Sequence, residues 1–129
     1  MDLAQARASL LALDQPAALV EGRYGPLNEE QSTYAQMIYA GSVKARQWLE
    51  DWCQLEGQTM PSEALAIHVH KINSGLTMMI GYASLMLSEF GGILGAELEA
   101  ALSAIVSTGE QVHLALQQNF EERLRNQSV

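Results

Sequence analysis

The sequence contains a single cysteine, Cys53, so it has no internal disulfide bond. A chain without disulfides fits a reducing compartment, and we expect Cys53 to behave as a small buried hydrophobic residue. Basic residues are also scarce: the chain has 7 lysines and arginines and 15 acidic residues, which give a net charge of -8. This charge argues against nucleic acids and anionic membrane surfaces as partners.

Long hydrophobic runs are missing as well. The longest apolar stretch, Leu76 to Leu87, is interrupted by polar residues and a glycine, and it is shorter than the roughly 20 residues that cross a bilayer. The first residues show no basic segment followed by an apolar run, so we expect no secretion signal. The sequence therefore predicts a soluble, cytoplasmic protein.

The composition favours one helical domain. Aromatic residues make up 6% of the chain and there are three prolines, whereas apolar residues make up 48% and charged residues 17%. A chain of 129 residues can bury its own core, so we expect a single domain over residues 1–129. Abundant Ala, Leu, Glu and Gln suit an all-α protein.

Glycines and prolines gather at three points that divide the chain into four expected helices. These points are Gly22-Arg23-Tyr24-Gly25-Pro26, Gly57-Gln58-Thr59-Met60-Pro61 and Gly91-Gly92. The first helix is expected from about Asp2, with Gln5 in the capping-box position, to about Glu21. Pro16 should kink or split it, because proline removes a backbone hydrogen bond and crowds the preceding turn.

The other three helices carry apolar residues at spacings of three and four, which is typical of helices packed in a bundle. The second begins at Asn28, with Gln31 in the capping-box position, and the third begins near Ser62. The polar tail of the fourth, Glu121 to Val129, is expected to fray. On the second helix the apolar stripe includes two tryptophans that we expect to anchor the core, Trp48 and Trp52.

Short connections favour antiparallel neighbours, so the predicted fold is an antiparallel four-helix bundle. Hairpin 1 would span about residues 1–57 and hairpin 2 about residues 61–129. A faint internal repeat relates the two hairpins. Gly25-Pro26-Leu27 aligns with Gly92-Ile93-Leu94, and at the same offset Ile38 aligns with Ile105. Chance similarity between two amphipathic hairpins is the alternative explanation.

The third helix contains His70-Lys71-Ile72-Asn73-Ser74-Gly75-Leu76, followed by Thr77-Met78-Met79-Ile80-Gly81-Tyr82-Ala83. This stretch resembles the phosphoacceptor helix of the dimerisation and histidine-phosphotransfer (DHp, or HisKA) domain of sensor histidine kinases. That family shows His-Glu/Asp-Leu/Ile-x-x-Pro-Leu and then Ile-Gly-Tyr/Phe-Ala. Here Lys71 replaces the acidic residue, and Gly75 replaces the proline that bends the family's helix.

The first half of the chain also resembles a DHp hairpin. The segment from Leu19 to Gln31 is similar to the family's connection between helices and the start of its second helix. Kinases pair two such hairpins from two chains, so the resemblance implies that this chain is a fused pair of DHp-like hairpins. Leu3 stands in the first half where His70 stands in the second, so one acceptor would remain.

The resemblance implies that His70 accepts a phosphoryl group. It lies about 100° from the centre of the expected buried face, at a partly open rim. Ser74 stands where the family often has a Thr or Asn that aids dephosphorylation, and Lys71 should point mostly to water. A receiver partner would bring its own aspartate and Mg²⁺, so no cofactor is expected on this chain. No ATP-binding domain or glycine-rich phosphate loop is evident, so no autokinase activity is expected.

A second apolar stripe on the third helix consists of Met78, Tyr82 and Leu85. If these side chains are exposed together they form a docking surface for a receiver, and the family places receiver docking just past the histidine. A homodimer or a neighbouring helix could cover them instead. His68 and His70 diverge by about 200° on a helix, so no metal site is expected.

Three functions follow from these patterns. The first is phosphotransfer between receiver domains through His70 in a two-component pathway, with a response regulator or a sensor histidine kinase as partner. The second is a catalytically silent adaptor or inhibitor that binds such a partner. The third is a plain helical oligomerisation module, in which His70 is an ordinary boundary residue.

Overall fold

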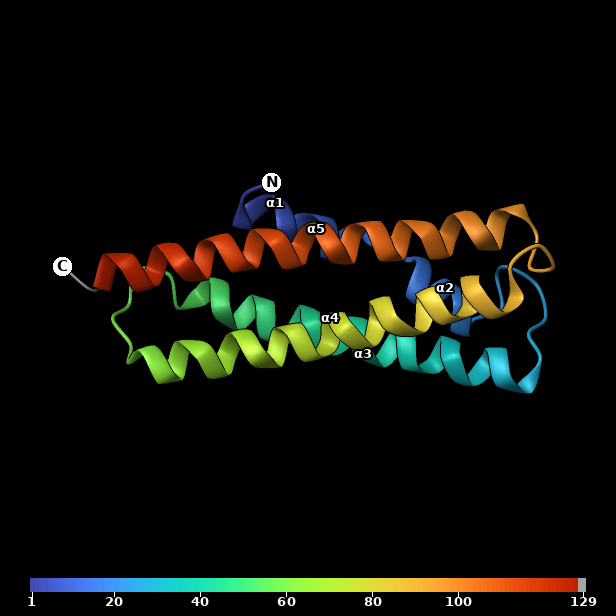
Figure 1. Ribbon diagram of the computed structural model, residues 1–129, viewed down its shortest axis with the longest axis horizontal. Coiled ribbons are helices and arrows are strands. Elements are labelled where there is room, and N and C mark those ends of the chain that lie inside the picture. The colour runs from blue at the N-terminus through green and yellow to red at the C-terminus, as the bar shows by residue number, and fades with distance from the viewer. Residues whose placement is uncertain (128–129) are drawn as a thin grey trace.

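The computed structural model describes residues 1–127, and within them all regular structure is helical (Figure 1). The prediction of an all-α protein is therefore confirmed. The helices are α1 (Leu3–Ala12), α2 (Gln15–Val20), α3 (Glu29–Gln54), α4 (Ser62–Phe90) and α5 (Ala96–Gln127). The connections that follow α2, α3 and α4 coincide with the three glycine- and proline-rich points of the sequence.

The first expected helix is split into α1 and α2. Asp2 caps α1 in a full capping box with Gln5, as predicted, and α1 ends at Ala12. Pro16 lies in the first turn of α2, where its missing N–H removes no helical hydrogen bond. Proline therefore ends one helix and starts the next, and the two short helices follow one another along the molecule.

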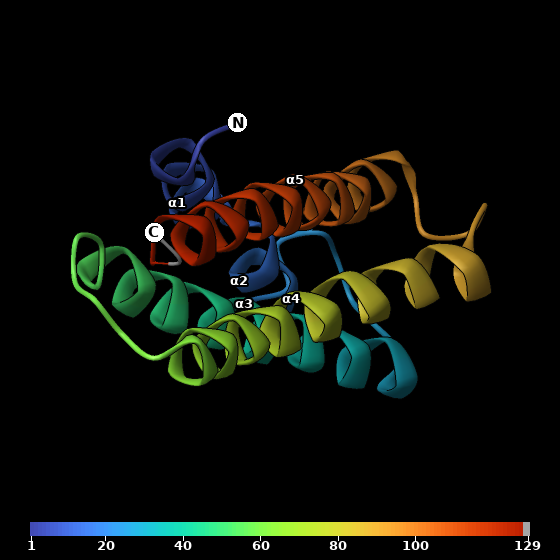
Figure 2. The same ribbon diagram turned by 60° about the vertical axis from the view of Figure 1, so that its left-hand side comes forward.

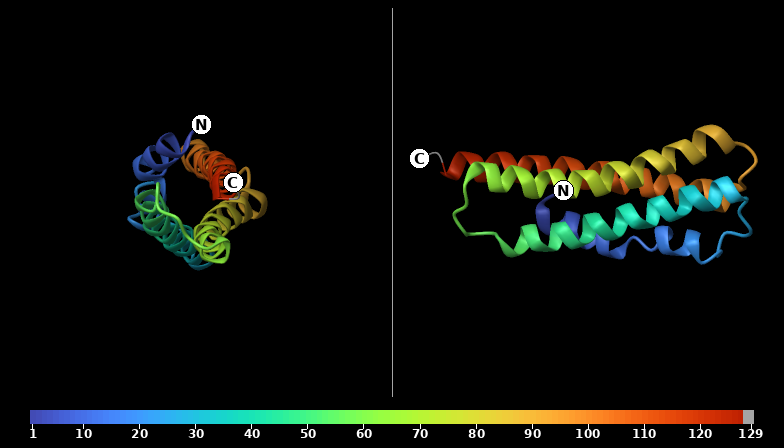
Figure 3. Two further views of the ribbon diagram at one scale, coloured as in Figure 1. Left: turned by 90° about the vertical axis from the view of Figure 1, so that its left-hand side faces the viewer. Right: turned by 90° about the horizontal axis from the view of Figure 1, so that it is seen from below.

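Helices α3, α4 and α5 lie side by side along the long axis, and successive helices run in opposite directions (Figures 1 and 2). Asn28 opens α3 with the predicted capping box to Gln31. Viewed end-on, the helices surround a common axis (Figure 3). The pair α1 and α2 packs against α3 and α5, and α4 packs against α3 and α5 from the opposite side.

One apolar core lies between the helices. Its largest fully buried side chains come from α1 to α5 and are Leu10, Leu19, Ile38, Leu49, Trp52, Leu65, Ile72, Leu76, Met79, Met86, Leu102 and Ile105. Trp52 anchors this core as predicted, with its Nε1–H donating to Asn119 Oδ1 at 2.8 Å. Trp48 is only half-buried and packs at the edge of the core, so the expectation that both tryptophans are core anchors holds for one of them.

Gly41 and Gly75 form the close crossing of α3 and α4. A Cβ atom built on Gly75 would lie 2.7 Å from both Ala45 N and Gly41 O, and one built on Gly41 would lie 2.6 Å from Gly75 O. Since α4 is helical from Ser62 to Phe90, Gly75 does not break the helix where the DHp family has proline. Its role in this structure is to let two helix backbones approach.

The end of α5 differs from the sequence prediction. The helix continues to Gln127 instead of fraying from Glu121, and Ser128 and Val129 lie outside the described residues. Arg123 stacks 4.0 Å from the Trp52 ring and donates to Trp52 O at 3.1 Å. Gln127 Oε1 accepts from Met60 N at 3.1 Å. These contacts with distant parts of the chain hold the polar tail in helical form.

Candidate functional site

His70 lies on the outer face of α4 and is exposed. Its neighbours on the same ridge, at spacings of three and four, are Ile67, Ser74, Thr77 and Gly81. Ile67 is 56% exposed, whereas Val69 and Ile72, on the core-facing side of α4, are buried. The ring is more open than the half-covered rim position expected from the sequence, and another protein can reach it.

Ser74 follows His70 by one helical turn and accepts a hydrogen bond from a lysine of the neighbouring helix. Lys44 of α3 donates from Nζ to Ser74 Oγ at 3.0 Å, and both side chains are half-buried. Lys44 was missed from the sequence because it belongs to another helix, and only the register of α3 against α4 brings it here. One sequence signal pointed to it: Lys44 and Lys71 are the only two lysines in the chain.

Lys71 is half-buried and packs on Trp48, whereas the sequence predicted that it points mostly to water. Its Nζ lies 4.1 Å from the centre of the Trp48 ring, in a cation–π contact. His68 packs against the same ring, with the two ring centroids 5.9 Å apart. Lys71 is therefore directed toward α3, whereas its neighbour His70 faces outward.

The middle parts of α3 and α4 contain no carboxylate side chains. Residues 31–49 of α3 and residues 64–88 of α4 contain no aspartate or glutamate, although the chain has a net charge of -8. Lys44 and Lys71 both lie in these ranges. The surface around His70 is consequently the part of α3 and α4 where an anionic group meets the least repulsion.

The expected docking stripe is largely covered by α3. The Tyr82 ring lies 5.5 Å from the Tyr34 ring, and Tyr82 and Met78 are both half-buried. Met78 lies beside Gly41, where the two helices cross. Leu85 alone is exposed, at 41%. Met78 and Tyr82 therefore do not form a free surface with Leu85, and a role for these residues in partner binding stays a prediction.

An apolar groove between α4 and α5 was not anticipated. Its volume is about 480 Å³, and its lining residues are Leu76, Thr77, Ile80, Gly81, Glu110, His113 and Leu114. Thr77 and Gly81 lie on the ridge of His70, and Leu114 is 62% exposed. His113, one of the lining residues, donates from Nδ1 to Asn73 Oδ1 at 2.9 Å, which joins α5 to α4 three residues after His70.

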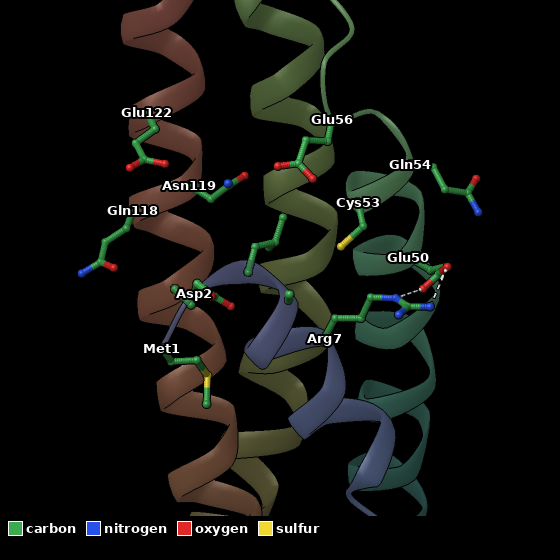
Figure 4. A pocket seen from close by; sticks show the side chains of 13 residues that line it. Met1, Asp2, Arg7, Glu50, Cys53, Gln54, Glu56, Gln118, Asn119 and Glu122 are labelled. Atoms are coloured by element: carbon green, nitrogen blue, oxygen red, sulfur yellow. Dashed lines mark hydrogen bonds and ion pairs between the residues drawn. The ribbon is translucent and has the colours of Figure 1, made fainter.

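A second pocket lies elsewhere (Figure 4). It has a volume of about 810 Å³ and is lined by the start of the chain, α1, the end of α3 and α5, with no residue from α4. Arg7 and Glu50 form an ion pair at its edge, and the guanidinium lowers the pKa of the Glu50 carboxyl. Burial raises the pKa of the Cys53 thiol, which disfavours the thiolate. This cavity has no connection with His70.

Within residues 1–127 no three His, Cys, Asp or Glu side chains lie close enough to hold a metal ion. Across the same span no helix combines the length and apolarity needed to cross a membrane. The chain matches no protein-family model, and neither a curated protein nor a solved structure matches it. The resemblance to DHp domains therefore depends on the sequence motifs alone, which are the His70 motif in α4 and the segment from Leu19 to Gln31.

Proposed function

We propose that this protein is a cytoplasmic two-component signalling protein that carries phosphoryl groups between receiver domains on His70. The observation that carries the proposal is the exposed position of His70 within a DHp-like motif on a long helix. A phosphoacceptor must present an imidazole nitrogen to an incoming protein, and a core histidine cannot do this.

The transfer requires little chemistry from this chain. A neutral His70 nitrogen attacks the phosphorus of a receiver aspartyl phosphate, the acyl P–O bond breaks, and the aspartate carboxylate leaves. The imidazole then releases its N–H proton to water. The receiver supplies the Mg²⁺ that neutralises charge on the phosphoryl oxygens, while this chain positions the nucleophile.

We further propose that the fold is an antiparallel four-helix bundle made of two DHp-like hairpins, α1–α2 with α3 and α4 with α5. Two hydrogen bonds support this proposal. Trp52 bonds to Asn119 and Met60 bonds to Gln127, and in both pairs the residues are 67 positions apart, which is the offset of the internal repeat. Contacts between equivalent residues are expected along the two-fold axis of a paired structure.

A receiver domain is the proposed partner, and the groove between α4 and α5 is its proposed docking surface. The groove continues from the ridge of His70 through Thr77 and Gly81, and Leu114 offers an exposed apolar side chain at its edge. A partner seated there would bring its active site over the His70 ring. Self-association through the same groove is the competing arrangement.

The test uses a panel of receiver domains from the source organism, each phosphorylated with acetyl phosphate. Each is mixed with the wild type, with His70→Ala or with His68→Ala, and acid-labile label on the protein is followed over time. We expect label on the wild type and on His68→Ala, which removes a histidine outside the proposed docking groove, and none on His70→Ala. Label that persists in His70→Ala contradicts the proposed acceptor. Stable binding of a receiver without any label favours the silent adaptor, and absence of both favours the oligomerisation module.

A further inference from the structure

We infer that Lys44 binds the phosphoryl group carried by His70, so that the acceptor site is built from both hairpins. This inference rests on the proposed function, because it concerns the same histidine. Hairpin 2 would supply the nucleophile from α4, and hairpin 1 would supply the cation from α3. No motif in the sequence links Lys44 with His70, and the connection comes only from the packing of the two helices.

The geometry places the ammonium about one helical turn from the acceptor. Lys44 Nζ lies 3.0 Å from Ser74 Oγ, and Ser74 follows His70 at the i+4 position. Side chains at i and i+4 lie on the same helix face with Cβ atoms about 5–6 Å apart. The lysine stem has four rotatable carbons, so its ammonium can turn from Ser74 toward oxygens bound to the His70 ring.

The charge of Lys44 is not neutralised by a carboxylate. Among the described residues, the ion pairs join Arg7 to Glu50 and Arg23 to Glu21, and none includes Lys44. The hydrogen bond that Lys44 makes is to a neutral hydroxyl. A half-buried ammonium without an acidic partner gains a charge-assisted hydrogen bond when a phosphoryl group arrives. In a chain of net charge -8, this local cation offsets the general repulsion of an anion.

The other lysine is unsuited to this role, although it is adjacent to His70 in sequence. Lys71 Nζ is held over the Trp48 ring at 4.1 Å, on the side of α4 that faces α3. Ser74, in turn, acts as the resting partner that holds Lys44 beside the ridge. When the phosphoryl group forms, Lys44 exchanges the hydroxyl for a phosphoryl oxygen.

The inference can be tested with phosphoramidate, a small donor that needs no protein partner. A neutral His70 nitrogen attacks phosphorus, the P–N bond of the donor breaks, and ammonia leaves with a proton from the donor or from water. The imidazole loses its N–H proton to solvent. Charge on the phosphoryl oxygens is neutralised by the ammonium of Lys44 in this step.

The informative variant is Lys44→Gln, because glutamine retains a donor for Ser74 but lacks the charge. We expect the second-order rate of His70 labelling to fall about tenfold or more, less than the 10²–10³ of a fully enclosed donor because Lys44 is half-exposed. Lys44→Arg should recover most of the rate. Arg46→Gln, which removes the same charge from the same helix, controls for the general field and should stay within about twofold of the wild type.

Added salt provides a second readout that a structural role would not change. Raising the ionic strength should slow labelling of the wild type more than labelling of Lys44→Gln, because screening weakens the attraction of an ammonium for the donor. Helical content by circular dichroism establishes that each variant is folded. If the wild type and a folded Lys44→Gln are labelled at equal rates, the role of Lys44 is overturned but the proposed acceptor is not. A wild type that takes no label, or His70→Ala that takes as much as the wild type, overturns the proposed acceptor as well.

Discussion

Replacing Gly75 with alanine should weaken the packing of α3 against α4, whereas the same replacement at Gly81 should stabilise the protein. Both glycines lie in the interior of α4, so both substitutions improve the intrinsic helix propensity equally. Their surroundings differ. A Cβ on Gly75 meets two backbone atoms of α3 at 2.7 Å, and a Cβ on Gly81 meets nothing within 4 Å.

The magnitudes follow from these contacts. Backbone atoms cannot rotate aside as a flexible side chain can, so the helices must separate by several tenths of an ångström at the Gly75 crossing. Overpacking of this kind costs about 1–3 kcal/mol, with backbone clashes toward the upper end. Alanine returns about 1 kcal/mol of helix propensity, which leaves a net loss of about 1–2 kcal/mol for Gly75→Ala. At Gly81 only the gain remains, about 0.5–1 kcal/mol.

Urea unfolding followed by tryptophan fluorescence and by circular dichroism measures both effects. We expect the midpoint of Gly75→Ala to fall and that of Gly81→Ala to rise, each with an unchanged slope. The comparison is sharp because the chemical change is the same and only the distance to α3 differs. If Gly75→Ala proves as stable as the wild type, α3 and α4 do not approach at this point and the register assigned to Lys44 is lost with it.

Three further outcomes are expected. Desolvation and hydrogen bonds to Glu30 and Glu89 raise the pKa of Tyr34 to about 12. In an alkaline titration followed by tyrosinate absorbance, the last phase should therefore be missing in Tyr34→Phe. Since the folded pKa exceeds the ordinary value of 10.0, this contribution to stability is complete below pH 10 and is lost as the pH rises toward 12. Cys53 should react with iodoacetamide at pH 8 much more slowly in the folded than in the urea-unfolded protein, and equal rates would contradict its burial. Trp52→Phe should lower the free energy of unfolding by about 1–3 kcal/mol, because it leaves a cavity in the buried core and removes the N–H donor from the half-buried Asn119 Oδ1, and a cost near zero would show that neither contact stabilises the core.

Local signals in the sequence predicted most of the secondary structure. Asp2 and Asn28 form the expected capping boxes, because a cap depends on residues within one turn. Pro16 separates α1 from α2 for an equally local reason. The end of α5 was not predictable in this way, since Arg123 is held by Trp52 from a distant part of the chain. Composition favours fraying there, and only the packed structure supplies the compensating contacts.

In the candidate site, too, local features could be predicted from the sequence and contacts between helices could not. The motif located His70, and its helical position predicted a partly open ring, whereas in the structure the ring is exposed on the outer face of α4. The partner of Ser74 could not be found, because a helical pattern gives the direction of a side chain but not the residue that it meets on the next helix. Tyr82 shows the same limit: its position on α4 left open whether a partner, a second copy or a neighbouring helix covers it, and the crossing at Gly41 brings α3 over it.

The proposed internal repeat also bears on the pairing of His70 with Lys44. The residues that occupy their positions in the other half of the chain, at the repeat offset of 67, are Leu3 and Gln111. Leu3 packs half-buried at the first residue of α1, and Gln111 is exposed on α5, the helix against which α1 packs. The equivalent place thus lacks both the nucleophile and the cation. If the pair acts together on a phosphoryl group, a fused pair of hairpins needs each member only once, and the two halves can contribute different parts of a single site.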